Sequence, residues 1–107
     1  MTSVRIYRGR RGQVSGFSVI GHAGSAPQGE DIVCAGLSAL AQAAVNALET
    51  VAGIKTTPRI GEGFLSVRLP RGLTKRELRT ARIILRTAEQ GFIDIAAAYP
   101  HYVRVSR

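Results

Sequence analysis

The sequence predicts an α+β fold, a two-layer sandwich in which two helices pack on one face of a mostly antiparallel sheet. Apolar residues alternate with polar ones in several short segments, which is the pattern of half-buried strands. In two longer segments they recur at steps of three and four, which is the pattern of amphipathic helices. The order is strands then helix, repeated once, and this order favours helices on one side of a sheet. The 107 residues have room for one modest core, so residues 1–107 are expected to form a single domain.

Five short strands are expected, and the glycine-rich segments between them predict two hairpin turns. Residues 9–12 contain Gly9 and Gly12 around two arginines, and residues 61–63 read Gly-Glu-Gly. The expected strands are residues 4–7, residues 14 to His22, residues 57–60, residues 64–69 and residues 102–105. The alternation does not determine the order of these strands in the sheet.

Two helices are expected, each with a recognisable start and stop. Asp31 suits an N-cap, because its carboxylate can accept an amide hydrogen of the first turn, and Gly53 suits a stop. The second helix has Thr74 as N-cap and Glu77 three residues later, which makes a capping box, and Pro100 ends it. The expected apolar stripes are Leu37, Ala41, Ala44, Leu48 and Val51 in the first helix, and Leu78, Ala81, Leu85, Ala88, Phe92, Ile95 and Tyr99 in the second.

The composition indicates which partners and which cellular compartment to expect. The formal net charge is +8, most of it from arginine, which favours contact with nucleic acid, a ribonucleoprotein or an acidic partner. A single cysteine excludes an internal disulfide and suits the reducing cytoplasm. No secretory signal is apparent, and the apolar run over residues 32–52 is interrupted by polar side chains, so no membrane span is expected.

One stretch carries the residues of a thiol-based site. If Asp31 caps the first helix, Cys34 lies in its first turn, where free amides and the helix dipole stabilise a thiolate. Those amides can also receive an oxyanion. His22 precedes the connecting loop of residues 24–29 and can act as the base that takes the thiol proton. Ser38 lies one turn beyond Cys34 on the same side, and Asp31 can orient His22 instead of capping the helix.

The same residues also have structural interpretations. Cys34 continues the apolar stripe, and a free cysteine is often a small buried hydrophobic residue. His22 can be a turn residue, and Asp31 is more often a cap than a catalytic group. One cysteine and two histidines do not make a zinc site, and the glycines match no phosphate-binding loop, so no metal or cofactor is expected.

The residues of this stretch also resemble a family signature. Gly-His-Ala-Gly at 21–24, Gly29, Asp-Ile-Val-Cys-Ala-Gly at 31–36 and Ser38-Ala39 resemble the Prp family, the bacterial ribosomal-processing cysteine proteases. The resemblance implies a homodimeric endopeptidase that removes the N-terminal extension of the large-subunit ribosomal protein numbered twenty-seven. It also implies that Cys34 is the nucleophile, that His22 is its partner, and that Asp31 and Ser38 support them.

A second hypothesis is a non-catalytic ribosome- or RNA-associated module. The second predicted helix carries basic residues at steps of four, three and four beside its apolar stripe, and these can contact phosphates. They are Lys75, Arg79, Arg82 and Arg86. A helix with a charged outer face gives the same pattern without any ligand. A thiol-blocking reagent separates the two hypotheses, because it stops hydrolysis but not charge-driven binding.

Overall fold

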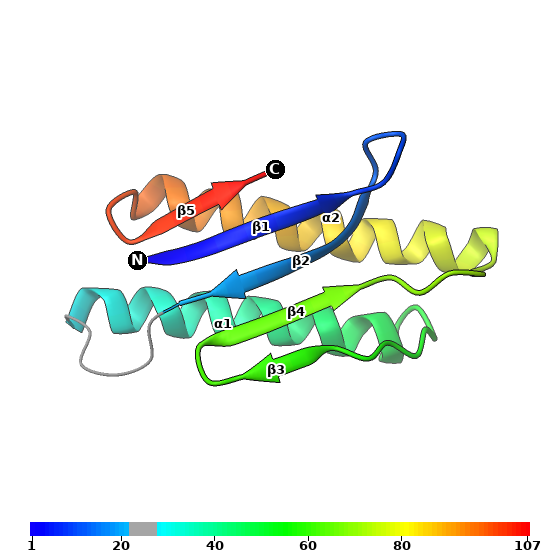
Figure 1. Cartoon of the computed structure of the whole chain (residues 1–107), viewed down its shortest axis with the longest axis horizontal. Helices are drawn as coiled ribbons and strands as arrows, with labels where there is room; N and C mark the ends of the chain where they lie inside the picture. Colours follow the sequence, from blue (N-terminus) through cyan, green and yellow to red (C-terminus); the bar gives the residue numbers. More distant parts are fainter. Residues whose placement is uncertain (22–27) are drawn as a thin grey trace.

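A computed structural model describes residues 1–21 and 28–107, with all of their side chains except those of residues 28–31. It confirms the expected sandwich, in which five strands form one sheet and two helices cover one of its faces (Figure 1). The elements in chain order are β1 (Thr2–Arg8), β2 (Val14–Ile20), α1 (Gln28–Thr50), β3 (Arg59–Gly61), β4 (Phe64–Arg68), α2 (Lys75–Ala98) and β5 (Val103–Ser106).

The sheet has the strand order β3-β4-β2-β1-β5. Four of the strands pair antiparallel to their neighbours, while β5 pairs parallel to β1, with Thr2 opposite Val103. Figure 1 views the sheet from its uncovered side, with both helices behind it. The second strand ends at Ile20, short of the expected end at His22, which lies outside the described residues. The amide of Gly21 still donates to the Gly63 carbonyl at 2.9 Å.

The core forms between the covered face of the sheet and the apolar sides of the helices. Val4 and Ile6 of β1 point into it, and Phe17 of β2 meets Phe92 of α2 edge to face, with ring centroids 5.2 Å apart. The helices contribute the buried side chains Val33, Leu37, Ala41, Ala44, Val45, Leu48, Ala81, Leu85, Ala88 and Phe92. The expected stripes are therefore confirmed over their central turns.

The helix ends agree with the predictions at some positions and differ at others. Thr74 and Glu77 form the expected capping box, with hydrogen bonds of 2.8 and 3.1 Å, and Gly53 adopts φ = +70° just after α1. Val51 lies beyond the end of α1 and is 66% exposed, so it does not extend the stripe. Tyr99 is the C-cap of α2 and is also largely exposed.

The start of α1 differs most from the prediction. The helix begins at Gln28, so Asp31 lies inside it and is not the N-cap, and the expected loop loses its last two residues to the helix. The sequence offers a physical reason for the earlier start. The acidic residues Glu30 and Asp31 are favoured in a first turn by the helix dipole.

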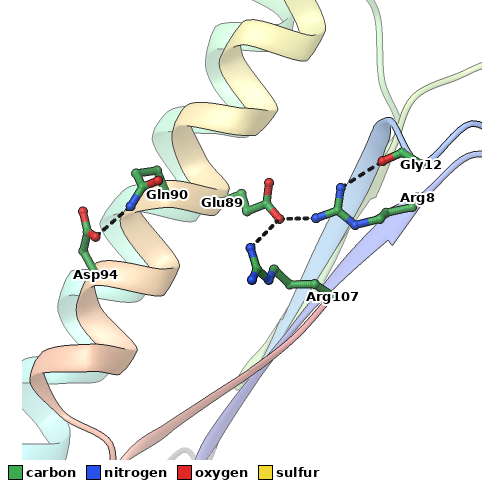
Figure 2. Close-up of polar contacts among 6 residues, drawn as sticks. All are labelled: Arg8, Gly12, Glu89, Gln90, Asp94 and Arg107. Carbon is green, nitrogen blue, oxygen red and sulfur yellow. Dashed lines mark hydrogen bonds and ion pairs between the residues drawn. The ribbon is translucent and has the colours of Figure 1, made fainter.

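A buried carboxylate joins three distant segments of the chain. Glu89 of α2 is only 8% exposed, and its Oε2 accepts from the Arg8 guanidinium of β1 and lies 3.9 Å from Nη1 of Arg107 (Figure 2). Arg8 also donates to the Gly12 carbonyl at 2.9 Å. The helix stripe predicted from apolar spacing does not include this position. The ion pair fixes α2 over the end of β1, since an unpaired charge would be costly there.

Candidate active site

Cys34 lies in the second turn of α1, and its free thiol is half-buried. Ser38 and Gln42 follow it at steps of four, so the three side chains form a row along one side of the helix. The Gln42 side-chain amide donates to the Ser38 hydroxyl at 2.8 Å. The Ser38 oxygen is thereby used as an acceptor, which leaves its own hydrogen free to donate elsewhere.

The row faces a cavity of about 210 Å³ between α1 and the β3–β4 hairpin. The polar side chains of Thr2, Cys34, Ser38 and Gln42 line the cavity, and apolar residues such as Ile60 and Leu65 form the opposite wall. A second cavity of about 210 Å³ shares Gln42, Ile60 and Leu65 with the first and extends along α1 to Asn46. Together they make a groove with a thiol at one end and mostly apolar walls.

The hydroxyl of Thr2 lies 3.2 Å from the Cys34 sulfur. Thr2 is the first residue of β1 and is only 2% exposed, and its amide donates to the Tyr102 carbonyl at 2.9 Å. Gly21 packs against it so closely that an added Cβ would lie 2.7 Å from the Thr2 hydroxyl oxygen. The glycine is therefore needed for space at this site, which is a different role from that of a turn residue.

Thr2 is a site residue that sequence reasoning missed. It precedes Val4 and Ile6 at the strand spacing of two, so it faces the same covered side of the sheet. A hydroxyl at the inward end of an otherwise apolar strand face was the available signal. That pattern does not predict that Thr2 contacts Cys34, which lies 32 residues away along the chain.

The structure describes the side chains of two of the four predicted site residues. Cys34 and Ser38 line the same cavity, as expected from their spacing. His22 and the side chain of Asp31 lie outside the described residues. Gly21, which directly precedes His22, is itself a wall of the cavity.

The expected role of the helix-start amides is wrong for Cys34. Only the first four amides of an α-helix lack an intrahelical acceptor, and in α1 these belong to residues 28–31. Cys34 lies three residues further on, beyond the turn where the dipole acts most strongly. Among the described residues, the polar side chain in contact with its sulfur is that of Thr2.

Comparisons with known proteins agree with this geometry. Residues 1–104 match the family model described as cysteine protease Prp. A curated Bacillus subtilis protein named ribosomal processing cysteine protease Prp is 30% identical, over 99% of this chain and 96% of that protein. A crystal structure described as a ribosomal processing protease Prp from Staphylococcus aureus with a substrate peptide superposes with a TM-score of 0.85 at 26% identity, covering 99% of this chain and 98% of that one. A crystal structure of SMU.848 from Streptococcus mutans superposes with a TM-score of 0.85 at 28% identity, covering 99% of this chain and 92% of that one.

Replacing Thr2 tests whether its hydroxyl supports the thiolate. Once Cys34 has lost its proton, only the hydroxyl can donate, so Thr2→Val should slow alkylation of Cys34 at neutral pH by about tenfold, the ratio that corresponds to ~1.4 kcal/mol for a hydrogen bond to a charged group. Thr2→Ser keeps the donor and should restore most of the rate. The measurement is iodoacetamide labelling followed by mass spectrometry. Equal rates in all three proteins would mean that the contact only fills space.

Proposed function

This chain belongs to the Prp family of cysteine proteases, a family of ribosomal processing enzymes, and we propose that it removes the N-terminal extension of the large-subunit ribosomal protein numbered twenty-seven in the cytoplasm. The observation that carries the proposal is the half-buried Cys34 thiol, which opens into the groove beside α1. Family membership sets aside the alternative of a module without catalytic activity. The apolar residues of the groove suit a substrate segment with hydrophobic side chains.

We propose a Cys34–His22 dyad for the chemistry. His22 takes the thiol proton, and the sulfur attacks the scissile carbonyl carbon to form a tetrahedral intermediate. When the carbon–nitrogen bond breaks, His22 returns the proton to the leaving amine, and water then hydrolyses the thioester to release the acid and the thiol. One observation supports this pairing, since His22 directly follows Gly21, a residue of the cavity wall. The proposed role of Asp31 is to orient His22.

The oxyanion needs donors other than the first amides of α1. Ser38 is the best candidate among the described side chains, because Gln42 donates to its oxygen and its own hydrogen is left to point into the cavity. We infer that Ser38 donates to the developing oxyanion or to a substrate carbonyl, and that Gln42 holds the hydroxyl in place.

We further propose that the protein is a homodimer with α1 at its interface. One side of α1 is uncovered and mostly apolar, and it includes Ile32, which is 64% exposed, with Ala39 and Ala43 on the same side. Residues Ile32–Thr50 have a mean hydropathy of 1.4, and only a third of this stretch is buried. The stretch is also long and apolar enough to cross a membrane, a test that core helices of water-soluble domains pass as well. A second copy of the chain would cover this surface.

Removing the thiol should abolish processing. Cys34→Ala leaves a cavity of about one atom and costs roughly 1 kcal/mol of stability, so the fold and peptide binding should survive. The assay incubates the purified protein with the ribosomal protein precursor and identifies the released extension by mass spectrometry. Measurable cleavage by the variant would show that another group is the nucleophile.

Removing the imidazole should slow turnover far more than it weakens substrate binding. His22→Ala should lower the cleavage rate by about 100- to 10,000-fold, the usual effect of losing general acid–base catalysis. The matched control is His101→Ala, which removes the other histidine of the chain, exposed in the turn before β5. Single-turnover kinetics should show near-parental rates for the control. A larger loss in His101→Ala than in His22→Ala would move the role of the base to His101.

A charge placed on the uncovered side of α1 should separate the subunits. Ala39→Glu adds a carboxylate that a dimer interface would have to desolvate, so the variant should be monomeric at micromolar concentration. Light scattering measures the mass, and Thr87→Glu on the exposed side of α2 is the control that should stay dimeric. A monomeric parent protein would refute the proposed assembly.

A further inference from the structure

The face of the sheet turned away from the helices is uncovered (Figure 1). Polar residues cross it. The register of the four strand pairs places one row of neighbours across all five strands. From β3 to β5 that row is Arg59, Ser66, Ser18, Arg5 and Ser106. Arg104 and Arg68 belong to the adjacent rows on the same face, beside Ser3 and Gly16 respectively. The four arginines define what we call the arginine face.

The charge of the arginine face is not neutralised by the protein itself. All four guanidinium side chains belong to exposed residues, and none has a carboxylate within ion-pair distance in the described part of the chain. No strand of the sheet contains aspartate or glutamate; the nearest acidic residue in the sequence is Glu62, in the β3–β4 turn. By contrast, Arg8 on the covered side of β1 is paired with Glu89. The strands of the uncovered face therefore carry four positive charges and no negative charge, beside an apolar pair formed by Ile20 and Phe64.

Tyr7 provides an independent sign of this positive field. The Arg68 guanidinium carbon lies 3.8 Å from the centroid of the Tyr7 ring, and that of Arg5 lies 5.9 Å away. A hydrogen bond with Ser18 lowers the pKa of the Tyr7 phenol, and the charges of Arg68 and Arg5 lower it further. The hydroxyls of Ser18 and Ser66 are hydrogen-bonded to Tyr7 at the middle of this face, and Ser18 is buried, so the donors open to an anion there are the guanidinium groups.

We propose that the arginine face binds the phosphate backbone of RNA. Arginine presents paired donors that fit phosphate oxygens, and the exposed hydroxyls of Ser3 and Ser106 can donate to the same groups. Strands lie about 4.8 Å apart, so Arg59 and Arg5, three strands apart, offer contacts spread over roughly 14 Å, which suits a chain of phosphates. An acidic protein partner is the competing ligand, because Ile20, which is 51% exposed, offers an apolar contact beside Phe64 on this face. Four guanidinium groups against one apolar pair favour phosphates, and the test with poly-glutamate separates the two ligands.

This binding surface lies on the opposite side of the sheet from α1 and the groove. RNA bound there would leave Cys34 accessible, so one molecule can hold RNA on one side and cut a peptide on the other. RNA binding is inferred from the residues of this face and does not depend on the proposed proteolysis. The two can therefore be tested separately.

The test compares two triple variants that lose the same charge. The first variant removes three of the four charges of the arginine face, by Arg5→Ser, Arg59→Ser and Arg104→Ser. The second removes three charges from the outer side of α2, by Arg79→Ser, Arg82→Ser and Arg86→Ser. Fluorescence anisotropy measures the binding of a labelled single-stranded RNA of about 20 nucleotides at several salt concentrations. The slope of the logarithm of the binding constant against the logarithm of the salt concentration should fall by about 2 when three phosphate contacts are lost, at ~0.7 for each contact. The α2 variant should keep nearly the parental slope. Both triple variants should cleave a free substrate peptide at the parental rate.

Three results would overturn the proposal. These are no binding of RNA by the parent at low salt, an equal loss of slope in the two triple variants, or tighter binding of a poly-glutamate peptide than of RNA. Circular dichroism checks that each variant folds. If the triple variant of the arginine face does not fold, Arg59→Ser and Arg104→Ser are measured singly, and each should reduce the slope by ~0.7. Loss of peptide cleavage with RNA binding intact would count against the protease proposal alone.

Discussion

Both helices bury their apolar sides against the same face of the sheet, and the other features of the molecule follow from that one-sided packing. Phe17 of the central strand β2 meets Phe92 of α2 at the middle of the layer, and Leu37 and Leu48 anchor α1 beside them. Because these contacts set the rotation of α1, the side of the helix that carries Cys34 is directed toward the β3–β4 hairpin. The same arrangement leaves the opposite face of the sheet open to solvent.

The thiol belongs to a site assembled from three parts of the chain. The first residue of β1 supplies a hydroxyl, the second turn of α1 supplies the sulfur, and the β3–β4 hairpin supplies the apolar wall. Gly21 lets these parts approach, since any side chain there would collide with Thr2. A thiol in a second turn gains little from the helix dipole, so a neighbouring donor matters more than it would at the end of a helix.

Local patterns in the sequence were enough to predict the strands, the helices and the cavity residues Cys34 and Ser38. They failed where one residue suits two positions, as at the start of α1, where Asp31 suits an N-cap but is equally favoured as an acidic residue inside a first turn. They also failed where the outcome depends on distant segments. The parallel pairing of β5 with β1, the carboxylate of Glu89 between two arginines and the contact of Thr2 with Cys34 all join residues far apart in sequence.

The parallel pairing of β1 with β5 also bears on when the enzyme matures. The amide of Thr2 bonds to the carbonyl of Tyr102, so the backbone that presents the Thr2 hydroxyl to the thiol is held by a segment about a hundred residues away along the chain. Pairings between such distant segments slow folding, because the entropy of closing the loop is lost before the contacts form. During synthesis, this pairing therefore cannot hold Thr2 beside the thiol until β5 has left the ribosome.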